Sequence, residues 1–469
     1  MSSQLPDVLN VKPLNFSESM SIDTNILDPI IVNNNFTRFV LERKGILDVG
    51  SVFTFSVHPV SAGDGKCFLP VKTGIHALIK KAVLKVGAKT LATSDEYGTY
   101  QTMKRAFKTN EEKEQKDLVK VGSSDVMQPD NQGTGKYQMK SDVYSDATTS
   151  LDDPSVRLRH STTECPVFQI RLSELFPMMR SVQLPLQFIN DDVSIEITFN
   201  TQSSSQTGIV ALFENTYSGD TSISVGTQNV KFLANYLNYS DDRMGGVASQ
   251  VLSATGLVMP YEDLILTSTS VPALSSTPTG SDVVKQDVIR DIGVSGKNVR
   301  SILVHNHKSS NNLLGKYSSE AFNVPEEYNF RINDKRVYSR NVVNEARKAN
   351  QLKDVFSTNI NCLSAEYSND PLTNKQAGNQ PINNHLIKDN TFHGHSMRQL
   401  EGAMHFTGVD LSTSPLQQTG AGTQVGQKPI EHILQFNRTA QNNSARSLKY
   451  YSMVERLMTI KGGQVLVSS

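Results

Sequence analysis

Apolar and polar residues alternate one by one in several short stretches of the chain, the pattern of strands with one buried face. In residues 51–58 three apolar side chains share one face of the predicted strand; they are Phe53, Phe55 and Val57. Residues 81–89 repeat the alternation, with lysines on the polar face. We therefore predict a strand over each stretch.

Residues 182–199 predict a hairpin, because two alternating stretches, 182–188 and 193–199, flank a short Asn/Asp turn. Pro185 within the first stretch favours an edge strand or an outward-facing backbone nitrogen. Further strands are expected at 209–213, 229–239, 300–306 and 328–333. The chain ends on a strand, a turn at Lys461-Gly462-Gly463 and a final strand, which repeats the predicted end of the first half.

Other segments lack this alternation. Residues 95–120 mix acidic and basic side chains without β-branched runs and predict a helix, and 121–160 are dense in turn-forming residues. We therefore expect an elaborated insertion at about 95–160. A second short helix is expected at 342–356. Two more insertions are predicted, a Ser/Thr/Pro loop at 266–282 extending to about 298, and an Asn/Gln-rich excursion at about 359–398.

The 469 residues exceed what one compact core usually holds, so more than one domain is expected. The Ser-rich stretch 201–208 is the best candidate boundary. The predicted organisation is an all-β chain with two antiparallel barrels in tandem. Its parts are an N-terminal arm at 1–32, a first barrel at 33–200 and a second at 208–469.

Composition narrows the function. Lys and Arg total 46 and Asp and Glu also total 46, which argues against a coat that neutralises phosphates over its whole surface. A local basic face would not show in this sum. The three cysteines are far apart, which argues against a disulfide framework or a structural zinc site. No signal peptide and no membrane span are expected, so the chain is expected not to be secreted.

Motifs for chemistry are weak. Gly65-Lys66 and Gly135-Lys136 lack the spacing of a phosphate-binding loop. His393, His395 and Glu401 faintly resemble the metal motif of cupins, but the spacing is poor and His432 lacks the expected context. His305 falls on a predicted strand, where a partly buried, hydrogen-bonded histidine is the usual outcome. We assign no catalytic, cofactor-binding or metal-binding residue, and expect no cofactor and no enzymatic activity.

Several longer stretches together resemble the major capsid proteins of Polinton-like viruses and virophages. They are 172–177, 183–199, 234–242, 328–342, 400–415 and 426–434. The resemblance spans roughly residues 35–469 and carries no catalytic residues. It implies two tandem eight-stranded jelly-roll barrels with long loop insertions and a few short helices.

The resemblance also implies a function. Three chains would form a pseudo-hexagonal capsomer, and capsomers would tile an icosahedral shell around a double-stranded DNA genome. The implied partners are other copies of the chain, a penton protein, minor or cement capsid proteins, and packaged DNA touching the inner face. The protein would be made in the host cytoplasm or nucleus and reside in the virion. Loops 95–160 and 359–398 would form towers or contacts between subunits, and residues 1–32 an inner arm.

Two other classes remain open at this point. A carbohydrate-binding or receptor-binding β-sandwich would need a groove with clustered aromatic side chains, and the sequence shows no such cluster. A cupin-like metal enzyme would bind a metal at His393, His395 and Glu401.

Overall fold

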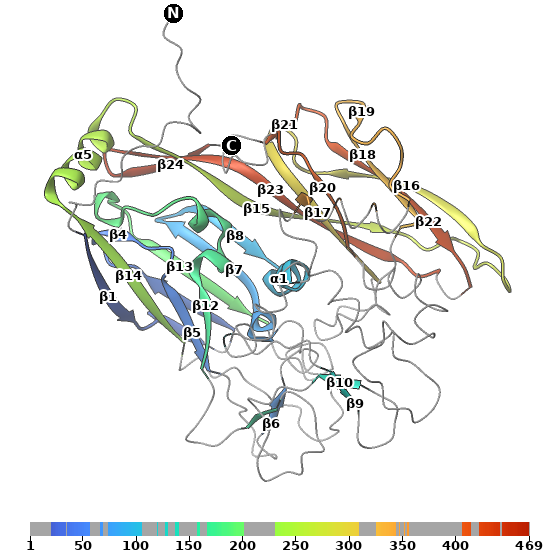
Figure 1. Cartoon of the computed structure of the whole chain (residues 1–469), viewed down its shortest axis with the longest axis horizontal. Helices are drawn as coiled ribbons and strands as arrows, with labels where there is room; N and C mark the ends of the chain where they lie inside the picture. Colours follow the sequence, from blue (N-terminus) through green and yellow to red (C-terminus); the bar gives the residue numbers. More distant parts are fainter. Residues whose placement is uncertain are drawn as a thin grey trace, which may run out of the picture.

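The computed structural model describes residues 20–33, 35–56, 66–68, 74–105, 120, 127–129, 137–139, 157–159, 167–200, 230–308, 325–343, 347, 351, 354–355, 406–413, 422–440 and 443–468. Within these residues, four larger antiparallel sheets form two sandwiches that lie side by side (Figure 1). The alternation of buried and exposed positions along most of their strands explains why these segments extend and pair.

The first sandwich is built around a cluster of aromatic and aliphatic side chains. One sheet has the order β1-β14-β5-β12, with β4 paired to β14. The other has the order β2-β3-β13-β7-β8. Their bounds are β1 (Met20–Leu27), β2 (Ile31–Asn33), β3 (Phe36–Val40), β4 (Ile46–Leu47), β5 (Val52–Ser56), β7 (Ile79–Val86), β8 (Lys89–Asp95), β12 (Val167–Arg171), β13 (Val193–Phe199) and β14 (Lys231–Tyr239). The rings of Phe53 and Phe232 stack at 4.4 Å within this core.

The second sandwich has its own core. One sheet has the order β15-β23-β17-β20, with β21 paired to β17 and β24 to β23, and the other has the order β16-β22-β18-β19. Their bounds are β15 (Leu257–Val271), β16 (Val284–Ile292), β17 (Asn298–Lys308), β18 (Glu327–Ile332), β19 (Lys335–Arg336), β20 (Phe406–Asp410), β21 (Thr423–Gln424), β22 (Ile430–Arg438), β23 (Arg446–Lys461) and β24 (Gln464–Ser468).

Short elements complete the described chain. The helices are α1 (Tyr97–Arg105), α3 (Leu172–Leu175) and α5 (Asp241–Leu252), with 3-10 turns η2 (Gly74–Leu78), η5 (Pro177–Arg180) and η6 (Leu186–Phe188). Two small ladders pair β6 (Lys66–Phe68) with β11 (Arg157–Arg159) and β9 (Met127–Pro129) with β10 (Tyr137–Met139). None of the described helices has the length and apolar character needed to cross a membrane.

Most predicted strands are confirmed. The stretches at 51–58, 193–199, 229–239, 300–306 and 328–333 correspond to β5, β13, β14, β17 and β18. The predicted end of the chain is β23, a turn with positive φ at Gly462 and Gly463, and β24. The helix predicted at 95–120 is confirmed as α1 over its first part. The strand predicted at 209–213, the insertion at 359–398 and most of the helix at 342–356 lie outside the described residues.

The hairpin predicted at 182–199 is wrong in its first half. Residues 186–188 form η6, and only Leu184 makes an isolated bridge, to Leu47. Pro185 has no N–H to donate to a ladder, and Val182, Leu184 and Leu186 are buried without forming a continuous strand. The single strand predicted over 81–89 is also wrong at its end, since Gly87 turns with a φ of 56° between β7 and β8.

The predicted insertion at 266–298 is wrong too. Residues 266–271 continue β15, and residues 284–292 form β16. Residues 266–271 are rich in Ser and Thr, but the backbone of both segments is paired, with β23 and β22 respectively, which a side-chain pattern does not reveal.

Two predicted boundaries shift. Part of the arm predicted at 1–32 is β1, which pairs along its whole length with β14, and residues 1–19 lie outside the described chain. The boundary predicted at 201–208 is too early, because β14 lies beyond it and completes the first sandwich.

Candidate assembly surfaces and a basic pocket

One pair of long strands joins the two sandwiches. β15 and β23 pair without interruption from Leu257↔Ile460 to Val271↔Arg446. Side chains at one end of this ladder, Tyr261, Met458 and Ile460, belong to the first core. Side chains at its other end belong to the second core; they are Val271, Leu448 and Tyr450. Figure 1 shows both strands running across the first sandwich into the second. The two sandwiches therefore share one ladder.

Polar contacts reinforce this seam. The buried Tyr261 hydroxyl donates to the carbonyl of Leu91 on β8 at 2.9 Å. Lys449 on β23 forms an ion pair with Glu96, next to the end of β8. Because these contacts join residues more than 150 positions apart, they fix how the sandwiches sit against each other.

A buried carboxylate lies at the same seam. Asp263 on β15 accepts the backbone N–H groups of Leu264 at 3.0 Å and Thr93 at 3.5 Å, and lies 3.1 Å from Arg456. Burial is the largest influence and raises the pKa of Asp263 to about 6, although Arg456 and the backbone donors oppose it.

An apolar stripe is exposed along the edge strand β1. Met20, Ile22 and Ile26 lie on one face of this strand and are 50%, 58% and 62% exposed. Further exposed apolar residues lie at and just before β2, the edge strand of the other sheet of the first sandwich; they are Ile30, Ile31 and Val32. We call these six residues the β1 stripe. An edge strand with contiguous exposed apolar side chains is typical of a surface that another chain covers.

A second apolar patch lies on the sheet that contains the seam. Val258 and Leu466 both pair with Thr459, from opposite sides, and Leu457 lies two residues before Thr459 on the same face. These three apolar side chains are close to half exposed. We call them the β24 patch.

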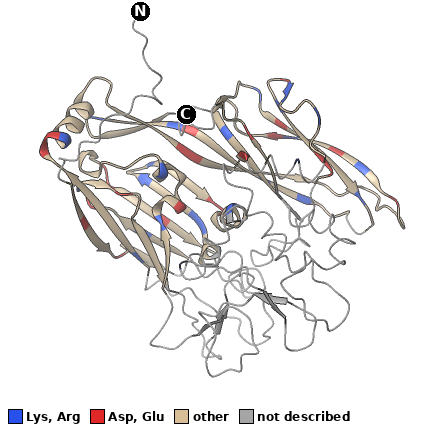
Figure 2. Cartoon of the chain, viewed as in Figure 1, with Lys and Arg blue, Asp and Glu red and all other residues tan. Residues whose placement is uncertain are grey.

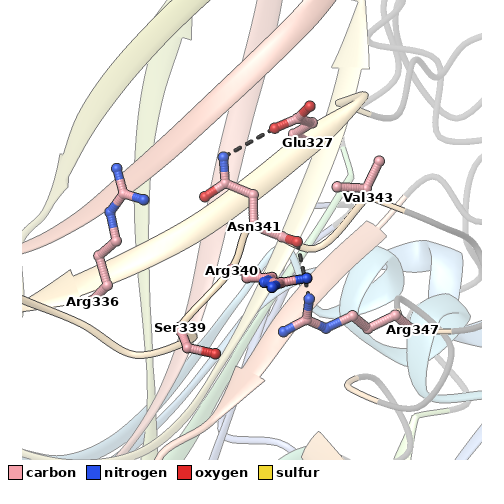
Figure 3. Close-up of a pocket in the computed structure, with 7 residues that line it drawn as sticks. All are labelled: Glu327, Arg336, Ser339, Arg340, Asn341, Val343 and Arg347. Carbon is pink, nitrogen blue, oxygen red and sulfur yellow. Dashed lines mark hydrogen bonds between the residues drawn. The ribbon is translucent and has the colours of Figure 1, made fainter.

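A basic pocket opens beside β18 and β19. Its volume is about 420 Å³, and its lining residues are Glu327, Arg336, Ser339, Arg340, Asn341, Val343 and Arg347 (Figure 3). Elsewhere in the described chain both signs of charge are interspersed over the two sandwiches (Figure 2). The lining of this pocket therefore contains more arginine than the surrounding surface. The net charge of the whole chain does not reveal such a local difference.

The histidines singled out from sequence have different outcomes. His393, His395 and Glu401 lie outside the described residues. His305 lies buried on β17, and His432 lies fully buried on β22. Across the described ranges, no three His, Cys, Asp or Glu side chains come together in a way that could hold a metal ion.

Sequence reasoning missed the β1 stripe, the β24 patch and the pocket. The alternation of Met20, Ile22 and Ile26 with polar residues is a signal for a strand within the segment predicted as an arm. Arg336, Arg340 and Arg347 fall within twelve residues, a signal that could have drawn attention to this segment.

No family model matches the sequence, and no curated protein matches it. Solved structures do match. The crystal structure of PBCV-1 VP54, fitted into a cryo-EM reconstruction of the virophage Sputnik, is matched over 96% of this chain and 97% of that one, at 10% identity and a TM-score of 0.58. The PBCV-1 virus capsid is matched over 96% and 97%, at 11% identity and a TM-score of 0.57. The Sputnik virophage structure is matched over 100% and 93%, at 10% identity and a TM-score of 0.55.

The chain has a double jelly-roll fold. This confirms the all-β double jelly roll expected from the resemblance, since the described chain contains two sandwiches in tandem. At 10–11% identity the likeness concerns the fold, and the matches run along nearly the whole of both chains.

Proposed function

We propose that this chain is a major capsid protein, a structural building block and not an enzyme. The observation that carries the proposal is the pair of jelly-roll sandwiches joined by one ladder, an arrangement matched from end to end by structures of a virus capsid and a virophage. The exposed apolar surfaces support it, because a shell protein must bury such surfaces against its neighbours.

The proposed assembly unit is a trimer. Two sandwiches of similar architecture in each of three chains give six corners, which suits a pseudo-hexagonal capsomer that tiles an icosahedral shell. The β1 stripe is the proposed contact between chains within the trimer, since it combines an open strand edge with exposed apolar side chains. Many weak contacts between neutral surfaces then add up across the shell.

The wider setting follows from this role. The shell would enclose a double-stranded DNA genome, with a penton protein at the vertices and minor or cement proteins between capsomers. The protein would be found in the virion, after synthesis in the host cytoplasm or nucleus. Contact with packaged DNA would be confined to the inner face and would not depend on base sequence.

Light scattering on the purified full chain, followed by electron microscopy, tests the trimer. We expect a species of three 51.7-kDa chains, about 155 kDa, with a hexagonal outline. A 51.7-kDa monomer at high concentration would refute the proposal.

A pair of variants tests the assigned surface. Replacing Ile22 and Ile26 with Asp places charges on the β1 stripe and should convert trimer to monomer, because a buried unpaired charge costs several kcal/mol. Ile289→Asp is the matched control, since Ile289 is 51% exposed on β16 of the second sandwich. If only the control variant dissociates, the trimer contact lies on the second sandwich and not on the β1 stripe.

A further inference from the structure

The wall of the basic pocket is held by backbone pairing. The chain turns after β18 through Asn333 and Asp334, which both have positive φ, and returns beside the same strand. Val337 donates its backbone N–H to Phe330 at 2.8 Å. Tyr328 and Val342 exchange two backbone hydrogen bonds, of 3.1 and 2.9 Å. The segment that carries Arg336 and Arg340 is therefore fixed to the sheet at both ends.

Two asparagines order the inside of this wall. Asn329 is fully buried, and its amide nitrogen donates to the Tyr338 carbonyl at 3.0 Å and to the Asn341 side-chain oxygen at 3.1 Å. Asn341 in turn donates to the Glu327 carboxylate at 3.0 Å. A partly buried polar network of this kind favours one arrangement of the lining side chains before any ligand binds.

The three guanidinium groups sit at different points around this network. Arg347 donates from Nη1 to the backbone oxygen of Asn341 at 3.0 Å, which anchors it at the pocket. Figure 3 shows Arg340 and Arg347 on one side of Asn341 and Arg336 on the other. Arg336 and Arg340 are exposed, and neither forms an ion pair with a carboxylate in the described part of the chain.

Two cations near the pocket have carboxylate partners of their own, unlike Arg336 and Arg340 within the described residues. Arg331 pairs with Glu431, and Lys428 pairs with Asp334. Within the lining, Arg336 and Arg340 have no carboxylate partner among the described residues, and the one lining carboxylate, Glu327, already accepts from Asn341. These two guanidinium groups lack a negative charge beside them, and an anion would supply it.

We propose that this pocket binds a small anion with more than one phosphate group. The guanidinium fork matches the oxygens of a phosphate in pairs, and phosphate oxygens accept from several donors at once. A hollow of about 420 Å³ is larger than one phosphate needs, and its cations are spread around it, so a linear diphosphate or triphosphate group fits it better than a lone oxyanion. The site is separate from the proposed trimer contact, because the β1 stripe belongs to the first sandwich.

Calorimetric titration of the full chain with inorganic tripolyphosphate, at constant ionic strength, tests this site. We expect saturable binding of one anion per chain. The double variant Arg336→Gln with Arg340→Gln should weaken binding at least tenfold, because it removes the charge-assisted hydrogen bonds of two guanidinium groups. Both side chains are exposed, so the fold should be retained, which circular dichroism checks.

Arg43→Gln is the matched control. Arg43 is an exposed arginine on the first sandwich, paired with Asp192 at 2.8 Å, and its loss should leave tripolyphosphate binding unchanged. An equal weakening in this control would mean diffuse attraction to the surface and would overturn the proposal. So would the absence of saturable binding to the unmodified chain.

Two competitor anions separate the ligand classes. Citrate offers three carboxylates, and if it binds as tightly as tripolyphosphate, the site does not select phosphate and the proposal fails. A short DNA duplex tests the nucleic-acid backbone as ligand. If the duplex binds through Arg336 and Arg340 while tripolyphosphate does not, the surface is a nucleic-acid contact and the small-anion site is refuted.

Discussion

His432 on β22 is a neutral histidine buried in the second core, and it should make the protein sensitive to acid. Its ring stacks on Phe330 with centroids 4.4 Å apart and planes inclined by 4°. Its Nδ1 lies 3.2 Å from the Tyr450 hydroxyl. Burial lowers the pKa of His432 from 6.5 to about 3, because an imidazolium there would lose its hydration. At pH 5 the unfolded chain therefore binds a proton at this residue and the folded chain does not.

The size of the effect follows from that difference. A histidine with a pKa of 6.5 in the unfolded chain and about 3 in the folded chain lowers the free energy of unfolding by about 2 kcal/mol between pH 7 and pH 5. The sign is fixed, since the stabilisation is complete above pH 6.5 and is lost as the pH falls toward 3.

Urea unfolding of the full chain and of His432→Phe at both pH values measures this difference. Phenylalanine keeps a ring between Phe330 and Tyr450 but cannot take a proton. We expect the unmodified chain to lose about 2 kcal/mol more than the variant on acidification. Tyr450→Phe is the control, because it removes the hydroxyl partner and keeps the histidine, so its pH dependence should stay like that of the unmodified chain. Equal pH dependence in His432→Phe and the unmodified chain would refute the reasoning.

Two further predictions concern the seam. The pKa of Asp263 is raised to about 6 in the folded chain, so its effect on stability is opposite in sign to that of His432. Its contribution increases the free energy of unfolding by about 1 kcal/mol as the pH falls from 7 to 5. Asp263→Asn should abolish this gain, and an unchanged pH dependence in that variant, measured in the same urea titrations, would count against the assigned pKa. Met458→Ala should cost about 2–5 kcal/mol, because Met458 is fully buried where β23 enters the first core. Thermal unfolding followed by calorimetry measures it, and a loss below 1 kcal/mol would show that the seam is not tightly packed.

The sequence predicted the strands that have one apolar face, for a physical reason. β5 and β14 bury a row of alternating side chains against a core, and burial is what alternation records. The same reasoning failed at residues 182–188, where Leu184 is buried from an isolated bridge and Leu186 from a 3-10 helix. Alternation signals which side chains are buried, and it leaves the backbone conformation open when a proline interrupts the stretch.

Strands whose side chains do not alternate between apolar and polar were not predicted. Ser268 and Ser270 extend β15 because they pair with Lys449 and Ser447 of β23, far away in the sequence. Their hydrogen bonds are made by the backbone, so no pattern of side chains had to mark them. The same limit applies to the boundary at 201–208, since a polar stretch marks a connection and does not say which sandwich the next strand joins.

The candidate surfaces could be predicted only in part. The neutral overall charge argued against a uniformly basic surface, but it concealed the pocket, because Arg336 and Arg340 are balanced in the sum by acidic residues elsewhere. The β1 stripe required knowledge of sheet order, since the exposure of Ile22 and Ile26 depends on β1 lying at an edge. Which strand lies at the edge of a sheet depends on the tertiary fold, so the exposure of its side chains cannot be read directly from one sequence.

The shared ladder links these observations to the proposed role. Because β15 and β23 contribute side chains to both cores, opening either sandwich would also break part of the ladder on which the other depends. The ion pair between Lys449 and Glu96 and the hydrogen bond from Tyr261 to Leu91 would be lost with it. The two sandwiches are thus coupled in stability as well as in position. A chain whose two sandwiches are coupled in this way keeps the distances between its contact surfaces fixed. Repeated contacts in a closed shell require this, because relative motion of the sandwiches would alter the same contact in every copy of the chain.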